Sequence, residues 1–237
     1  MKLKVYIWAL VDFPTIIHAV NQTWPMAIGL MLSPFPVLAL LIILMTANAR
    51  RNSLWFMIGW FTGIIAVAML AYFIPGLLGG NNEPTATSGW VRVAFGILLL
   101  IGANRQYGKR PKKGEVPKIP RLIARLDRVG IGSSLFTGFL LSGINVKNVM
   151  FIAGGTLTIV KAPGSLFTHA FAFIIFMLIG TTLLFLLLGA YFIYGTKSQE
   201  ILFKCRMWLT QHVYSVLAGL LMFISALLFF QAWQILT

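Results

Sequence analysis

The chain has 237 residues, of which 59% are apolar and only 10% are charged, whereas about 25% of the residues of a soluble domain are charged. This composition excludes an ordinary water-soluble globule and indicates a membrane protein. The formal net charge is +14, and the single cysteine, Cys205, excludes a disulfide framework or a cysteine metal cluster within one chain.

The first 24 residues resemble a signal peptide in outline, because two lysines precede a short apolar run at residues 5–11. Asp12 and Pro14 interrupt this pattern, and no clear small-residue cleavage site follows it. We therefore predict that residues 1–24 form an interfacial or re-entrant segment before the first membrane span. A cleaved signal peptide is the alternative.

Six apolar segments follow, and each is a candidate for crossing the hydrocarbon core, which takes about 20 residues of helix. The third is short and has Arg92 near its start, and the fourth is long and polar in its middle. The sequence thus predicts an all-α polytopic membrane protein with six transmembrane helices. The segments are residues 25–47, 54–74, 90–103, 131–159, 166–191 and 213–235.

The positive charge lies mainly in alternate connections. The loops after the first, third and fifth segments hold 14 of the 19 lysines and arginines. By the positive-inside rule these loops are cytoplasmic, and both termini face outward, as expected for a multi-pass protein of the plasma (inner) membrane. Because topology accounts for most of the charge, we do not expect nucleic acid to be a partner.

The linker at residues 104–130 is the one sizeable polar segment. Pro120 is well placed as a first helical residue, and Arg121, Arg125 and Arg128 follow on one face of the predicted helix. Such a basic amphipathic helix suits the anionic inner leaflet. It is either a topology signal that lies on the membrane or a site that recognises an anionic lipid directly.

A short internal repeat divides the chain. Residues 29–37 match residues 138–146 without gaps at an offset of 109, with identity at a glycine, a leucine, a serine and a valine. The first matched piece lies in the first of the six segments, and the second lies in the fourth, so each piece begins a group of three. Because three spans carry the chain to the opposite side of the membrane, the second group starts there and has the inverted orientation. We therefore predict two inverted three-helix repeats, at residues 25–103 and 131–237, as in many transporters.

The first matched piece predicts a broken helix. Pro34 and Pro36 lack a backbone N–H and oppose a continuous helix, so carbonyls near residues 30–32 lose their intrahelical partners. Freed backbone groups at membrane depth need protein, hydroxyl or water partners. Ser33 is next to the break and is a candidate partner.

The fourth segment is also predicted to break, after Gly143. Asn145, Lys147 and Asn148 then place three strongly polar groups within four residues. A lysine deep within a span is costly and is a functional hypothesis by default, although a structural lysine bonded to the freed carbonyls, or one that snorkels to an interface, is the alternative. The predicted spans contain no Asp or Glu, so a substrate with a phosphate, sulfate or carboxylate group is favoured.

Other features carry less chemistry. No metal-ligand spacing, nucleotide-binding loop or nucleophile–base pair is present, so we expect neither an enzyme nor a metal or cofactor. Gly59 and Gly63 form a G-x-x-x-G pattern in the second segment, which predicts a packing face and would permit a homodimer.

Four motifs together resemble the lysine-exporter superfamily. They are Ser-Pro-Phe-Pro at residues 33–36, Ala-Arg-Arg at residues 49–51, the basic linker that ends near Asp127, and Asn-Val-Lys-Asn at residues 145–148. Within the superfamily, the linker and the Ala-Arg-Arg boundary are most similar to the peptidoglycolipid-addressing branch, which includes the sulfolipid-addressing proteins. In the family pattern the second motif reads Asn-Pro-Lys, and here Val146 replaces the proline.

The resemblance implies six spans in inverted halves and the outward movement of glycolipids or other envelope lipids. It also implies a central site, built from Ser33, Pro34 and Pro36 in one half and from a second set in the other half. This second set is Asn145, Lys147 and Asn148.

Our first hypothesis is an exporter or flippase that moves an anionic or glycosylated envelope lipid towards the outer leaflet, with Lys147 holding its head group. An exporter of small polar solutes such as amino acids, and a non-transporting scaffold for envelope synthesis, are the alternatives.

Five arginines are expected to contact lipid head groups at the inner leaflet, namely Arg50, Arg51, Arg121, Arg125 and Arg128.

Overall fold

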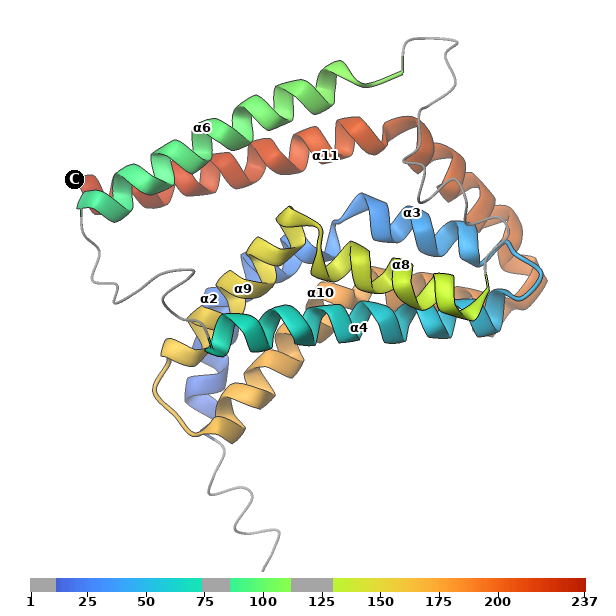
Figure 1. Ribbon diagram of the computed structural model, residues 1–237, viewed down its shortest axis with the longest axis horizontal. Helices are drawn as coiled ribbons and strands as arrows, with labels where there is room; N and C mark the ends of the chain where they lie inside the picture. Colours follow the sequence, from blue (N-terminus) through green and yellow to red (C-terminus); the bar gives the residue numbers. More distant parts are fainter. Residues whose placement is uncertain (1–11, 74–85, 112–129) are drawn as a thin grey trace, which may run out of the picture.

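The computed structural model describes residues 12–73, 86–111 and 130–237, and the helices in these ranges leave only short connections (Figure 1). Eight α-helices and one 3₁₀ turn, η2 (Gly195–Ser198), make up the described part. The predicted all-α fold is therefore confirmed for these residues.

The first predicted break is present. Helix α2 (Phe13–Met31) and helix α3 (Pro34–Ile43) meet at an angle of 50°. Pro34 is the first residue of α3, because its ring fixes a helical φ and its missing N–H costs nothing in a first turn. Helix α2 begins well before the predicted start of the first span and runs through Pro25, so residues 13–24 belong to this bent pair.

The second predicted break is also present and needs no proline. Helix α8 (Ile131–Gly143) and helix α9 (Val146–Lys161) meet at 64°. Asn145 caps α9, because its side-chain oxygen accepts the backbone N–H of Lys147 at 3.2 Å. An asparagine cap satisfies an N–H that the new helix leaves unbonded.

The two bent pairs of helices align with each other at a different residue offset from that of the sequence match. Met31 and Gly143 end the first helix of each pair, and Ser33 and Asn145 precede the second, which gives a separation of 112 residues in both cases. The sequence match at an offset of 109 pairs Ser33 with Ser142, which lies inside α8. The matched register was therefore wrong by almost one helical turn.

Three unbroken helices are long and apolar enough to cross a membrane, or up to five spans if each bent pair counts as one. They are α4 (Ala49–Phe73), α10 (Leu166–Tyr194) and α11 (Gln199–Leu236). Helix α6 (Ala86–Gly108), which contains the predicted third span, is not among them. By length and composition the described helices thus give up to five spans, and the third of the six predicted spans stays a prediction.

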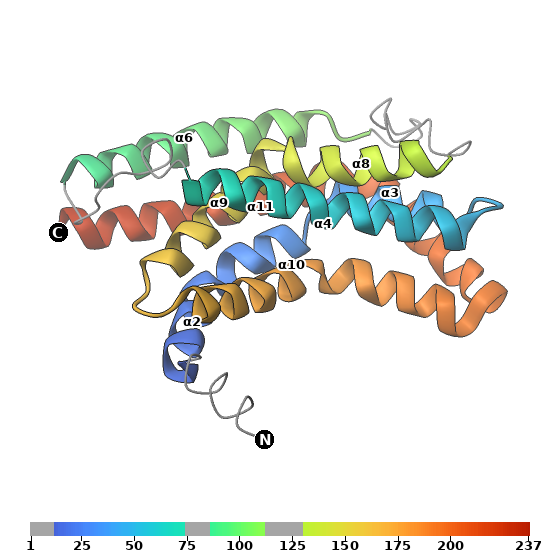
Figure 2. The ribbon, with the colours of Figure 1, turned by 60° about the horizontal axis from the view of Figure 1, so that its bottom comes forward.

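Helix α11 is longer than a span needs. Its 38 residues extend about 57 Å, nearly twice the thickness of the hydrocarbon core. Its first part lies against α3, and α6 runs along its second part in both views (Figures 1 and 2). Ser225 of α11 donates to the backbone carbonyl of Gly96 in α6 at 2.8 Å, which joins the two helices.

Helix α3 forms the centre of the core. Every residue from Val37 to Leu44 is buried, which suits a helix that is apolar on all sides. Around it, Trp60 of α4 donates its indole N–H to the hydroxyl of Thr181 in α10 at 3.3 Å. Both side chains are fully buried, so this bond ties the two long helices together inside the protein.

Helices α4 and α8 cross at very close range. A Cβ on Gly59 would meet the backbone of Leu135, and one on Gly138 would meet the backbone of Phe56. The predicted packing face of Gly59 and Gly63 is thus confirmed, but it packs within the chain. The predicted homodimer stays a prediction without support from this face.

The described parts of the predicted basic loops lie at one end of the molecule. Figure 1 shows the turn between α3 and α4, the turn η2 and the start of α8 at this end, and the C-terminus and the turn between α9 and α10 at the other. We call the first end the basic end, because the start of α4 holds Arg50 and Arg51, η2 holds Lys197, and the start of α11 holds Lys204.

Candidate functional site

Lys147 joins the two helix breaks. Its ammonium donates a hydrogen bond to the backbone carbonyl of Gly29 at 2.9 Å, from the first turn of α9 to the last turn of α2. The lysine is partly buried. The one cation predicted deep in a span therefore lies where the two bent pairs meet.

The break in α2 makes the Gly29 carbonyl available. In a continuous helix this carbonyl would accept the N–H of Ser33, but Ser33 bonds to the carbonyl of Leu30 instead, at 3.2 Å. Leu30 is free to accept because Pro34, its partner in a continuous helix, has no N–H. Carbonyls near residues 30–32 were predicted to lose their helical partners, and in the structure the Gly29 carbonyl loses its partner while the Leu30 carbonyl accepts from Ser33.

This contact is the one that the structural interpretation of Lys147 predicted. An ammonium has three N–H groups, and within the described residues Gly29 is the one acceptor that its hydrogen bonds reach. The same lysine can therefore hold the two bent pairs together and still donate to an anionic group. The structure is compatible with both interpretations.

Phe151 completes this cluster and was not singled out in the sequence. Its ring centroid lies 5.3 Å from the Lys147 nitrogen, within the range of a cation–π contact. Gly29 allows the approach, because a Cβ there would lie 2.5 Å from the Phe151 ring. The spacing of four residues between Lys147 and Phe151 was the one sequence signal for this contact.

Asn148 satisfies the other break. Its side-chain nitrogen donates to the carbonyl of Leu141 at 2.7 Å, a carbonyl that would bond to residue 145 in a continuous helix. Its side-chain oxygen is buried without a hydrogen-bond partner in the described part of the chain, and so is the hydroxyl oxygen of Ser33. Each break therefore retains one buried polar atom that could accept a hydrogen bond.

The two prolines of the predicted site shape the break. Pro34 and Pro36 are buried in the first turn of α3 and have no polar group to offer a ligand other than a carbonyl. Their contribution is the bend itself, and Pro34 also lines an apolar cavity.

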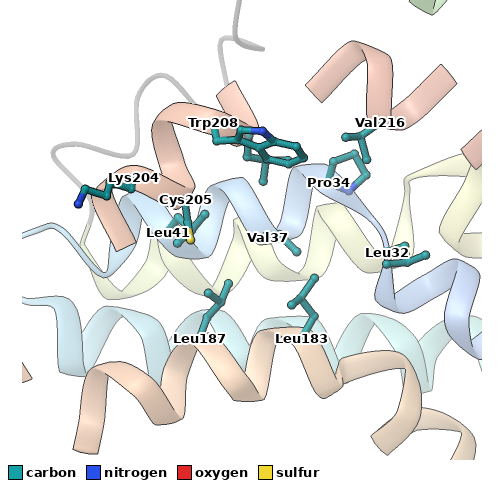
Figure 3. A pocket seen from close by; sticks show the side chains of 11 residues that line it. Leu32, Pro34, Val37, Leu41, Leu183, Leu187, Lys204, Cys205, Trp208 and Val216 are labelled. Carbon is teal, nitrogen blue, oxygen red and sulfur yellow. The ribbon is translucent and has the colours of Figure 1, made fainter. Parts of the chain in front are cut away.

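This cavity lies between α3, α10 and α11 and has a volume of about 540 Å³ (Figure 3). We call it the α3 groove. Leu32 lies at one end of the lining, beside the break, and Lys204 lies at the other (Figure 3). Its remaining walls include Pro34, Val37, Leu41, Leu183, Leu187 and Trp208. The sequence could not reveal it, because three separate helices form its walls.

The structure describes two of the five predicted head-group arginines. Arg50 and Arg51 are exposed at the basic end, and the guanidinium carbon of Arg50 lies 5.8 Å from the centroid of the Phe192 ring. The other three lie outside the described residues, so they stay predictions: Arg121, Arg125 and Arg128.

Comparison with known proteins gives one finding. A family model described as "Sap, sulfolipid-1-addressing protein" matches residues 24–234, which is most of the chain. This match confirms the resemblance to the peptidoglycolipid-addressing branch of the lysine-exporter superfamily. No curated protein and no solved structure gives a significant match.

Proposed function

Since the chain belongs to the sulfolipid-1-addressing protein family, we propose that it moves a cell-envelope lipid with an anionic or polar head group towards the outer leaflet of the plasma membrane. The family is one of membrane proteins, and its name refers to a sulfated lipid. The proposed activity is transport without chemical change of the lipid.

The junction of the two breaks carries the proposal. Lys147 supplies a cation at the bond to Gly29, and Ser33 and Asn148 supply two buried acceptors at the same breaks. Cations, hydroxyls and amides together suit a head group that carries both sulfate or phosphate and sugar hydroxyls.

An apolar path begins beside this junction. The α3 groove touches Leu32 and Pro34, the residues on either side of Ser33, and continues to the basic end. The lining offers a small polar solute almost no polar partner apart from Lys204, whereas an acyl chain needs none. The groove therefore favours a lipid over a small solute as the substrate.

The membrane topology that fits this function has six spans in two inverted halves. Helix α6 would be the third span and each bent pair one span, with the basic end in the cytoplasm and both termini outside. The two bends support a repeat of this kind, because in each half a polar residue in an extended conformation, Ser33 or Asn145, precedes the second helix of the bent pair.

The test is lipid mass spectrometry on the purified protein. We expect an anionic or glycosylated lipid to co-purify with the native chain and to be lost from Lys147→Met, which keeps most of the length of the side chain but removes its charge. Lys161→Met is the matched control, because Lys161 lies on the same helix and is exposed at its end. Bulk lipids alone, unchanged by Lys147→Met, would contradict the proposal.

A further inference from the structure

We propose that the α3 groove binds an acyl chain of an anionic membrane lipid whose head group lies beside Lys204 at the basic end. This inference rests on the proposed function, and it assigns a place for the lipid before it reaches the helix breaks. It commits to a lipid from the leaflet at the basic end as the occupant.

The shape and lining of the groove fit one acyl chain. Its volume of about 540 Å³ lies in the range of small-molecule sites, and its walls are almost wholly apolar. The lining on α3 runs from Pro34 to Leu41, a rise of about 10 Å along the helix axis. The groove is therefore elongated along α3, from the basic end towards the break.

The mouth of the groove has the residues of a water–lipid boundary. Lys204 and Trp208 lie one helical turn apart on α11, and both line the groove (Figure 3). Trp208 is 56% exposed and stacks on His212, with ring centroids 4.8 Å apart. Tryptophan and lysine side chains favour the head-group level, so a chain that enters here leaves its head group beside the ammonium.

The charge at the mouth selects for an anionic head group. Lys204 pairs with Glu200 at 2.6 Å, but both side chains are about three-quarters exposed, so the pair is weak. Arg206 of α11 adds a second cation near the end of α3. A guanidinium nitrogen of Arg206 lies 3.7 Å from the sulfur of Met45, which follows α3 in the chain.

A second apolar cavity provides the internal control. It has a volume of about 620 Å³, lies between α4, α9 and α10, and has no lysine or arginine in its lining. We call it the α9 groove, and its walls include Ile65, Tyr72, Thr156, Ile159, Phe173 and Met177. If apolar lining alone attracted lipid, both grooves would bind acyl chains without regard to the head group.

The experiment uses the full chain in phosphatidylcholine vesicles that contain a small amount of phosphatidylglycerol with a diazirine on one acyl chain. Phosphatidylcholine with the same diazirine chain is the matched probe, and peptide mass spectrometry maps the labelled residues after illumination. We expect phosphatidylglycerol to label the α3 groove several-fold more than phosphatidylcholine does, and the α9 groove to show no such preference.

Two pairs of variants sharpen the result. Leu187→Trp fills the α3 groove and abolishes its labelling, whereas Leu186→Trp, at a neighbouring position that is 64% exposed, leaves the labelling intact. Lys204→Gln lowers the preference for the anionic probe about fivefold. This ratio corresponds to the attraction of about 1 kcal/mol between one lysine and an anionic membrane surface. Glu200→Gln raises the preference, because it removes the ion-pair partner of Lys204.

Equal labelling of the α3 groove by the two probes overturns the proposal, as does labelling no stronger than that of the exposed face of α10. Lipid co-purification that depends on Lys147, together with an unlabelled α3 groove, overturns this inference and leaves the proposed function standing. A labelled groove with co-purification that is unaffected by Lys147→Met overturns the proposed function and supports the groove.

Discussion

At the scale of the residue, the bond between Lys147 and the Gly29 carbonyl is the feature from which the site is built. The sequence showed the lysine, the flanking asparagines and the two prolines, because each breaks a rule for a membrane helix. It did not show that the acceptor is Gly29 or that Phe151 lies over the ammonium. Those contacts depend on how α2 and α9 cross, which no local pattern encodes.

Gly29→Ala tests this contact through packing. The added Cβ collides with the ring of Phe151, so we expect the free energy of unfolding in detergent to fall by about 1–3 kcal/mol, as for other overpacked cores. Adding Phe151→Leu to this variant should restore part of the loss.

Gly219→Ala is the control for helix propensity. A Cβ at Gly219 meets nothing within 4 Å, so this change should stabilise helix α11 slightly. Equal stability of Gly29→Ala and Gly219→Ala would show that Phe151 does not pack against Gly29 as described.

At the scale of the element, the sequence predicted where two helices break, but it did not predict which residues of the two breaks are equivalent. Pro34 and the polar run from Asn145 located both bends, because a helix cannot continue through residues that remove or compete for its hydrogen bonds. The equivalence of the bends escaped the sequence comparison, because residues 29–37 share four identities with residues 138–146 but only one with residues 141–149, the segment that the bends pair with them. The cap residues Ser33 and Asn145 define the equivalence instead.

The crossing of α4 and α8 gives a prediction for two glycines on one helix. Gly138→Ala places a Cβ against the backbone of Phe56, which cannot rotate away, so we expect a larger loss of thermal stability than for Gly29→Ala. Gly132→Ala, where a Cβ meets nothing within 4 Å, should leave the melting temperature nearly unchanged. Similar melting temperatures for both variants would contradict the close crossing.

At the scale of the whole molecule, charge and structure agree on which connections share a side. The turn between α3 and α4, the turn η2 and the start of α8 lie together at the basic end, as the distribution of lysine and arginine predicted. The apolar grooves could not be predicted, because the sequence shows which residues are apolar but not where neighbouring helices diverge.

The native cysteine reports the orientation. Cys205 is exposed near the basic end, and the sequence holds no other cysteine. We expect a membrane-impermeant maleimide to label it in inverted membrane vesicles and not in intact spheroplasts. Thr237→Cys in a Cys205→Ser background should show the reverse pattern, and labelling of Cys205 from outside would contradict the topology.

The most direct test of lipid movement compares surface lipids with whole-cell lipids. In cells without this protein, mass spectrometry should find an anionic or glycosylated envelope lipid that is depleted from the surface extract and retained in the whole-cell extract. The native chain and Lys161→Met should restore it to the surface, and Lys147→Met should not. Identical surface profiles with and without the protein would contradict the account.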